Sequence, residues 1–477
     1  MAKKGLLGGS YKLLSEDDIA QIHDTSMRVI EEVGFQVNSD KALAFFRGAG
    51  AEVNGHIVRL PREKVMELLA RAPSEVTLYG RQPEQNITLG GARVYAGTGG
   101  TALNVIDSSS GERRRATLHD LKQIAKLVDG LENIHFFLLP TYPSDVAVEN
   151  VDVNRFFAGL DNTSKHIMGG VYTLDGIRRV IRMAEIVAGS ADRLRQEPII
   201  SMIICIISPL KIDRNYGDMI VAIAEEGIPI VVPAEPLCGA TSPVTLAGNL
   251  VVQNADSLSG VCLTQLVNPG TPVLYGSVAT TTDLRDLKYL SGPIEMGLLN
   301  AASAQMAQFY HLPYYATAGM SDAKVIDAQC GYESALSSLL CALSGANFIH
   351  DAAGLLDFAL SVSYEKYVVD NEIIGMVMRA VEGIRVDEDS LAFDLIKEVG
   401  PAGHFVAARH TRKHMHTEHY QPTLSERDNL KEWQAKGKKD TYIRAREKVE
   451  EILSAPGYRL PGEVRQRVLE EVPGIIT

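Results

Sequence analysis

The sequence predicts an α/β protein built on a TIM, or (β/α)8, barrel. Eight short apolar runs rich in valine, isoleucine, tyrosine and phenylalanine recur between residues 92 and 354, and helical patterns separate them. The runs are apolar throughout, as in parallel strands that are covered on both faces. Eight βα units within about 260 residues match the usual size of this barrel. An open, doubly wound parallel sheet is the alternative.

The expected strands follow one another along the barrel region: 92–99, 134–142, 165–173, 199–208, 228–236, 272–280, 313–321 and 346–354. Amphipathic helices are expected between them. Thr117 opens one helix, whose apolar face carries Leu121, Ile124 and Val128, and Gly227 ends another.

Two further regions flank the predicted barrel. We expect residues 1–90 to form an N-terminal helical extension that packs on the barrel, residues 91–365 to form the barrel, and residues 366–477 to form a C-terminal helical region. A capping box at Ser15 opens the first helix of the extension. The charged stretch 431–453 is typical of a solvated helix.

Composition narrows the possible functions. The net charge of −12 argues against a nucleic-acid surface. The apolar runs are shorter than the 18 or so residues that a membrane span needs, and the first residues are too weakly apolar for a secretory signal. The five cysteines form no C-x-x-C pair. We expect them to be reduced core residues of a cytoplasmic protein.

Glycines at the end of the first expected strand are the first candidate for a ligand site. Gly97, Gly99 and Ala102 satisfy a relaxed G-x-G-x-x-A pattern, which in a dinucleotide site precedes a helix. Here the pattern leads into TALNVIDSSSGERRR (101–115), which is typical of a β-hairpin, so a nucleotide site is disfavoured. The glycines either turn the chain only, or let the backbone N–H groups of Gly99 and Gly100 approach a carboxylate.

Polar residues at the other expected strand ends add to this site, because catalytic groups of TIM barrels lie at the C-terminal ends of strands. They are Tyr142, Gly169, Gly170, Tyr172, Ser208, Glu235, Ser277, Ser321, Asp322, His350 and Asp351. Glu235 could instead cap a helix or pair with an arginine, and His350 could be a core histidine. We expect the mouth to carry negative charge, which together with aromatic residues suits a cationic ligand. The aromatic candidates are Tyr95, Tyr142, Tyr172, Tyr315 and Phe358, although at least half of them could be ordinary core residues.

A histidine-rich segment, 409–420, follows the barrel. It holds His410, His414, His416 and His419, and two histidines four residues apart could bind zinc on a helix. Arginine and lysine side chains between them would repel a dication. We therefore expect no metal site.

Three segments resemble the trimethylamine methyltransferase (MttB-like) family: 104–134, 318–334 and 410–422. The likeness extends over nearly the whole chain. Founding members of that family demethylate trimethylamine and carry pyrrolysine near the seventh barrel strand. This chain has only ordinary residues through SDAKVIDAQCGYES (321–334), so the resemblance points to the members that lack pyrrolysine and act on quaternary amines.

The resemblance implies a function. The chain is expected to move a methyl group from a quaternary amine to the Co(I) corrinoid of a separate protein. Glycine betaine is the first candidate substrate; proline betaine, carnitine and γ-butyrobetaine are alternatives. The sequence lacks the D-x-H-x-x-G signature that anchors cobalamin, so a corrinoid protein is expected to dock at the barrel mouth. We also expect a homo-oligomer.

These inferences combine into one hypothesis for the site. Gly99 and Gly100 offer backbone N–H groups to the substrate carboxylate, and His350, the catalytic candidate, hydrogen-bonds the same end. Tyr95 and Phe358 face the trimethylammonium group, with Glu235 as a more distant counter-charge. Two other classes remain open: a betaine-binding protein without catalysis, and a barrel enzyme that depends on a metal or a nucleotide.

Overall fold

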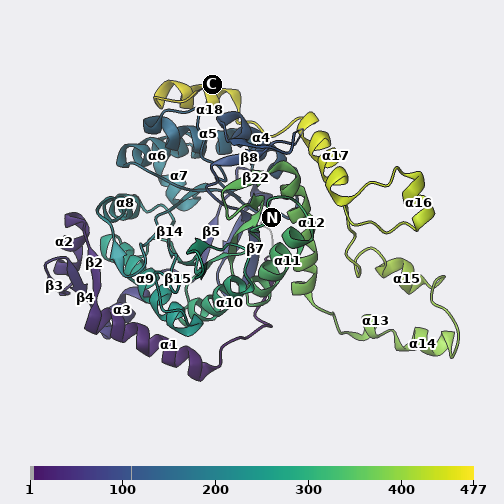
Figure 1. Cartoon of the computed structure of the whole chain (residues 1–477), viewed down its shortest axis with the longest axis horizontal. Coiled ribbons are helices and arrows are strands. Elements are labelled where there is room, and N and C mark those ends of the chain that lie inside the picture. Colours follow the sequence, from purple (N-terminus) through teal and green to yellow (C-terminus); the bar gives the residue numbers. More distant parts are fainter. Residues whose placement is uncertain (1–4, 109, 477) are drawn as a thin grey trace.

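The computed structural model describes residues 5–108 and 110–476, and its centre is a closed parallel barrel (Figure 1). Eight strands pair in the order β7-β20-β19-β16-β14-β12-β11-β10, and a parallel bridge between Gly97 and Phe136 closes the ring between β7 and β10. The TIM-barrel prediction is therefore confirmed, and the open sheet is excluded.

Each barrel strand lies inside its predicted run. The strands are β7 (Arg93–Thr98), β10 (Phe137–Leu138), β11 (Ile167–Gly170), β12 (Ile200–Ile203), β14 (Ile230–Ala234), β16 (Val273–Ser277), β19 (Tyr314–Thr317) and β20 (Phe348–Ala353). Nearly all of their residues are buried, because helices cover the outer face and side chains fill the interior.

Eight helices surround the strands (Figure 1). They are α4 (Leu118–Asp129), α5 (Val151–Asn162), α6 (Leu174–Ala188), α8 (Arg214–Glu225), α9 (Leu246–Val267), α10 (Ile294–Phe309), α11 (Ala328–Leu343) and α12 (Tyr364–Glu382). Thr117 caps α4 with the capping box that its sequence suggests. The eighth helix, α12, packs on α11 and β20 and continues past residue 365, where we expected the barrel to end.

The N-terminal end of the barrel is sealed. A hairpin of β5 (Val76–Leu78) and β6 (Ile87–Leu89) packs its apolar side chains against Phe136, Met168 and other residues that point into the barrel. Since this end is filled, a ligand can reach the interior only from the C-terminal mouth.

The remaining N-terminal residues combine helices with short strands. Helix α1 (Glu16–Arg28) begins at the predicted Ser15 capping box and packs on α9. Helices α2 (Asp40–Gly48) and α3 (Arg62–Leu69) flank a sheet of β2 (Phe35–Val37), β3 (Glu52–Asn54), β4 (Ile57–Arg59) and β13 (Lys211–Ile212). The extension is thus not purely helical.

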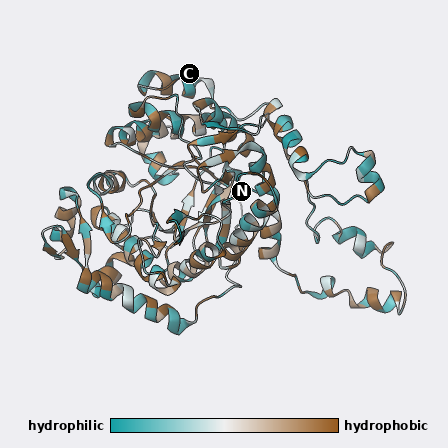
Figure 2. Ribbon diagram, viewed as in Figure 1, coloured by the Kyte–Doolittle hydropathy of each residue, from teal (hydrophilic) through white to brown (hydrophobic). Residues whose placement is uncertain are grey.

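The C-terminal region leaves the barrel and returns (Figure 1). An arm holds α13 (Glu388–Leu391), α14 (Phe393–Val399), α15 (Arg409–His414) and α16 (Leu430–Ala435), and then α17 (Thr441–Ser454) and α18 (Gly462–Glu471) pack back on α12 and α6. The predicted helix 431–453 is two helices, α16 and α17, with Gly437 between them at φ 91°. Hydrophobic residues occur along the arm as well as in the barrel (Figure 2). None of the described helices is long and apolar enough to cross a membrane.

Candidate active site

A cavity of about 410 Å³ opens at the C-terminal mouth of the barrel. Residues at the ends of seven of the eight strands line it, so it lies where TIM-barrel active sites form. The lining residues are Gly100, Thr101, Gly170, Val171, Tyr172, Ile203, Ile204, Cys205, Tyr216, Pro233, Glu235, Val278, Tyr289, Tyr315, Met320, His350, Asp351, Phe358, Ala359 and Leu360.

Glu235 supplies a negative charge to this cavity. It directly follows β14, its side chain is open to the cavity, and it has no hydrogen bond or ion pair with any described residue. The surrounding barrel walls, and to a lesser extent the charge of Asp351, raise the pKa of Glu235 to about 7. A bound cation would stabilise the ionised form.

His350 and Asp351 form a buried pair on β20. The Nε2 atom of His350 lies 3.0 Å from Oδ2 of Asp351, while its Nδ1 atom lies 2.7 Å from the carbonyl oxygen of Ala316. The ring stacks on Tyr315, with 4.0 Å between centroids. Since protein atoms occupy both ring nitrogens, His350 orients Asp351 and does not present a free donor to a ligand.

Gly99 fits against Asp351. A Cβ atom at Gly99 would lie 1.7 Å from Oδ1 of Asp351, so only glycine leaves room for this carboxylate. Asp351 itself has φ 62°, a strained backbone conformation, and its Oδ1 atom has no hydrogen-bond partner among the described residues. Gly99 thus lets the Asp351 side chain approach the backbone at the end of β7, whereas Gly100 lines the cavity.

The structure brings most of the predicted site residues together, with one exception. Gly100, Glu235, His350 and Phe358 line the cavity, and Gly99 contacts it through Asp351. Tyr95 lies in the sealed end of the barrel, where its hydroxyl oxygen accepts a 3.4 Å hydrogen bond from the backbone of the hairpin. Tyr95 precedes Gly99 by four residues, which places it ~13 Å down the strand from the mouth.

Phe358 lies in a turn at the rim. Asp357, Phe358 and Ala359 all have φ between 56° and 62°, between β21 (Leu355–Leu356) and β22 (Ser361–Ser363). Three such residues in a row store strain, which gathers at functional sites. The Nζ atom of Lys324 lies 3.7 Å from the centre of the Phe358 ring, so one face of the ring already holds a cation.

The strand after the glycines confirms the hairpin prediction. β8 (Asn104–Ile106) pairs antiparallel with β9 (Arg113–Arg115) and parallel with β22. Because no helix follows the glycines directly, the dinucleotide interpretation fails. The hairpin instead supports the rim, where Arg113 contacts the carboxylate of Asp357 at 2.7 Å.

Sequence reasoning left out several residues of the cavity. Tyr289 is the last residue of β18 (Lys288–Tyr289), which forms a rim hairpin with β17 (Thr280–Asp283) that the sequence did not suggest. Tyr315, one of the aromatic residues expected at the mouth, does line the cavity from β19. Cys205, expected in the core, is instead open to the cavity. Burial within the barrel walls and the charge of Glu235 raise the pKa of Cys205 to about 12, so it stays a neutral thiol.

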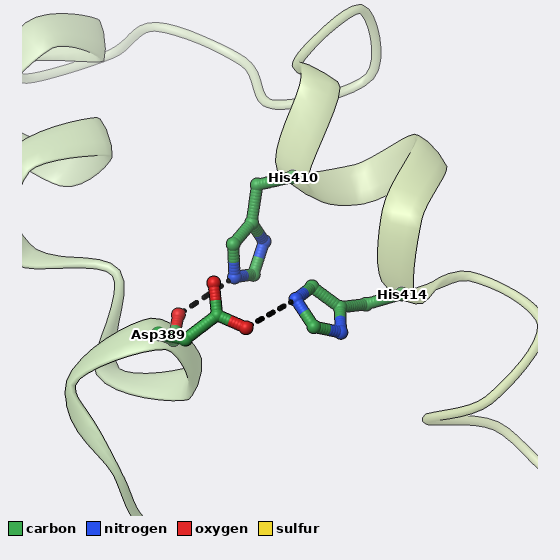
Figure 3. Close-up of side chains that lie close together, drawn as sticks. All are labelled: Asp389, His410 and His414. Carbon is green, nitrogen blue, oxygen red and sulfur yellow. Dashed lines mark hydrogen bonds and ion pairs between the residues drawn. The ribbon is translucent and has the colours of Figure 1, made fainter.

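Two histidines of the histidine-rich segment, His410 and His414, lie beside Asp389 on the arm (Figure 3). Asp389, His410 and His414 each offer one ligand atom within 4.8 Å of the others. The Asp389 carboxylate already lies 2.7 Å from Nζ of Lys413 and 3.5 Å from Arg385. A dication would have to displace these two cations, and the absence of a metal site therefore stays a prediction.

Comparisons with known proteins agree along almost the entire chain. The family model for trimethylamine methyltransferase (MTTB) matches residues 7–468. A glycine betaine methyltransferase of Desulfitobacterium hafniense (strain Y51) is 37% identical over 453 residues, 94% of each chain. Trimethylamine methyltransferase MttB of Methanosarcina barkeri is 38% identical over 459 residues, 94% of this chain and 92% of that protein.

A solved structure resembles this one more distantly. The monomethylamine methyltransferase MtmB of Methanosarcina barkeri aligns over 93% of this chain and 95% of its own, with 13% identity and a TM-score of 0.47. The family model and the relatives are the decisive matches, because they cover nearly the full length at well over 30% identity. The chain therefore belongs to the trimethylamine methyltransferase (MTTB) family and is a methyltransferase.

Proposed function

We propose that this chain transfers a methyl group from a quaternary amine, with glycine betaine as the first candidate, to the Co(I) corrinoid of a separate protein. Members of its family methylate a corrinoid protein. The observation that carries the choice of a quaternary amine is Glu235, unpaired among the described residues, beside Asp351 in a cavity with four tyrosines. One relative with 37% identity is a glycine betaine methyltransferase.

A quaternary ammonium group needs this kind of cavity. It has neither a lone pair nor an N–H bond, so carboxylates and aromatic faces bind it rather than hydrogen bonds. Tyr216, Tyr289 and Tyr315 supply aromatic surface, and Glu235 supplies charge. A volume of about 410 Å³ suits a small amine and is too small to enclose a corrinoid ring.

For this reaction the protein mainly has to orient the substrate. The corrinoid supplies the electron pair that accepts the methyl group, and the tertiary amine leaves with the pair of the broken C–N bond. No proton moves, so the chain requires no general base. Its residues hold one N–CH₃ bond toward the open mouth, which is a proximity effect. We propose that the corrinoid protein docks there.

Two further properties belong to this proposal. The arm exposes large apolar side chains, among them Ile384, Phe393 and Val406 at 85%, 71% and 83% of their surface. Such exposure is typical of a protein interface, and we propose a homo-oligomer.

All five cysteines are free thiols, which fits a cytoplasmic location.

Methyl transfer in a purified system tests the function. The chain with glycine betaine and cob(I)alamin, or a corrinoid protein, should give methylcobalamin and dimethylglycine. Proline betaine, carnitine and γ-butyrobetaine serve as competing substrates. Trimethylamine should react slowly, since the segment 321–334 is written with ordinary residues only and we expect no pyrrolysine there. Demethylation without cobalt, or trimethylamine turnover as fast as the best quaternary amine, would contradict the proposal; binding without transfer would indicate a betaine-binding protein.

A further inference from the structure

Arg155, on α5, is a fully buried cation behind the cavity wall. It forms no ion pair with the described residues, and such a charge is costly to bury unless neutral groups satisfy it. Five oxygen atoms do so, one for each N–H bond of the side chain. Nε donates to the Thr141 carbonyl at 3.0 Å. Nη1 donates to the Gly170 carbonyl at 3.2 Å and to the Tyr172 hydroxyl at 3.3 Å. Nη2 donates to the Thr101 hydroxyl at 2.9 Å and to the Leu139 carbonyl at 3.0 Å.

Arg155 fixes how two hydroxyl groups of the cavity can hydrogen-bond. A guanidinium group only donates, so Thr101 and Tyr172 accept from it through their oxygen atoms. Each hydroxyl keeps its own proton, and neither has another hydrogen-bond partner among the described residues. Both residues line the cavity. The guanidinium thus leaves two neighbouring O–H groups free to act as donors.

The two acidic residues of the cavity lie at different places in the ring of strands. Arg155 bonds to the ends of β10 and β11 and to the loop after β7. In the closed ring, β10 and β11 lie opposite β16 and β19. Glu235 follows β14, the neighbour of β16, and Asp351 lies within β20, the neighbour of β19. The nearby carboxylate of Asp152 accepts from the backbone N–H groups of Tyr172 and Thr173 at the start of α6 instead. Glu235, which follows β14, therefore lies across the barrel from the Thr101 loop after β7, whereas Asp351, on the neighbouring strand β20, borders that loop.

We propose that Thr101 and Tyr172, held by Arg155, form a carboxylate subsite, with the backbone of Gly100 beside it. The ligand class is a zwitterion whose quaternary nitrogen lies near Glu235 and whose carboxylate reaches the two hydroxyl groups. This inference rests on the proposed function and replaces His350 as the partner of the carboxylate. Arg155 is a positioning residue, and Thr101 and Tyr172 contact the ligand.

Binding of two ligands that share a cation tests the subsite. Glycine betaine carries the carboxylate and tetramethylammonium does not, and calorimetric titration of the full chain measures both. Thr101→Val and Tyr172→Phe each remove one hydroxyl and keep the shape of the side chain. Each should weaken glycine betaine binding about 10- to 100-fold, the effect of losing a charge-assisted hydrogen bond. Tetramethylammonium binding should stay unchanged.

The matched control is Thr101→Ser, which retains the hydroxyl and should bind glycine betaine like the wild type. Thermal unfolding checks that each variant is folded. Unchanged glycine betaine affinity in Thr101→Val and Tyr172→Phe overturns the subsite, as does an equal loss for both ligands. If the wild type binds neither ligand, or binds them without methyl transfer to cobalt, the proposed function fails instead.

Discussion

Glu235 carries its charge into the cavity without a counter-ion among the described residues, and this makes it the side chain on which cation binding depends. Its environment is largely acidic or neutral: Asp351 on β20, the thiol of Cys205, and the hydroxyl groups of Tyr289 and Tyr315. The phenol pKa values of both tyrosines are raised by burial, so these groups stay neutral at physiological pH. Glu235 is therefore the titrating group to examine.

Cation affinity should rise with pH through the pKa of Glu235, which is about 7. Below that pH the carboxyl group is neutral and attracts a cation weakly; above it the group is ionised. Tetramethylammonium should therefore bind up to about tenfold more tightly at pH 8 than at pH 6. Glu235→Gln should bind weakly at both values and lose the dependence. Isothermal titration calorimetry measures the tetramethylammonium affinity at both pH values. Glu84→Gln, which removes a carboxylate outside the cavity, is the control. An unchanged pH profile in Glu235→Gln would assign the effect to another group.

At the level of elements, the contact between the end of β7 and β20 brings Asp351 into the site. Gly99 permits this contact, since any Cβ atom would overlap Oδ1 of Asp351. The sequence suggested glycine as a donor of backbone N–H groups. The structure adds a steric reason that depends on the neighbouring strand, which a single segment does not reveal.

Gly99→Ala should lower the free energy of unfolding by about 1–3 kcal/mol, the usual effect of overpacking, and should weaken tetramethylammonium binding by displacing Asp351. Gly331→Ala is the matched control, because it lies in α11 with no atom within 4 Å of its added Cβ. Alanine there should be neutral or stabilising. Chemical denaturation measures both variants. If Gly99→Ala were as stable as Gly331→Ala, Asp351 would not limit the space at Gly99.

Local sequence patterns predicted the strands well and the site in part. The apolar runs predicted parallel strands buried on both faces, and their number, eight, favoured the barrel over an open sheet. Glu235 and His350 were found because the sequence pattern placed them at expected strand ends; Glu235 does follow β14, whereas His350 lies within β20. Arg155 was missed, since an arginine on a helix is typical of a solvated face. It is buried because its side chain points from α5 toward the ends of β10 and β11, where oxygen atoms from segments far from α5's own sequence pattern accept its N–H groups.

Tyr95 illustrates the opposite error. Its residue type suited the ligand, and its strand was predicted correctly, but its depth along β7 was not considered. A side chain that points into the barrel can face either the sealed end or the mouth, and the distance to the strand end decides between them. The sealed end itself could not be predicted, because the β5–β6 hairpin has short strands and only tertiary contacts place it against the barrel interior.

At the level of the whole molecule, the arm from α13 to α16 extends from a closed barrel that needs no further support (Figure 1). Its helices are short, and none of their residues is buried. Leu391, Phe393 and Ile396 are more than half exposed. An isolated segment of this kind cannot bury enough apolar surface to be stable on its own, so a second copy of the chain is its expected cover.

The arm should join two copies through apolar contact and without metal. Replacing both Phe393 and Ile396 with aspartate should shift the assembly toward the monomer in light scattering, because it places charges at the interface. The same substitution at exposed Ile443, on α17, which packs on α12 and is not one of the arm helices α13 to α16, is the control. Chelation with EDTA should leave the wild-type assembly intact, since Lys413 and Arg385 already neutralise Asp389. Dissociation by EDTA, together with stoichiometric zinc in the purified protein, would instead make Asp389, His410 and His414 a metal site that holds the arm. A monomeric wild type would contradict the oligomer itself.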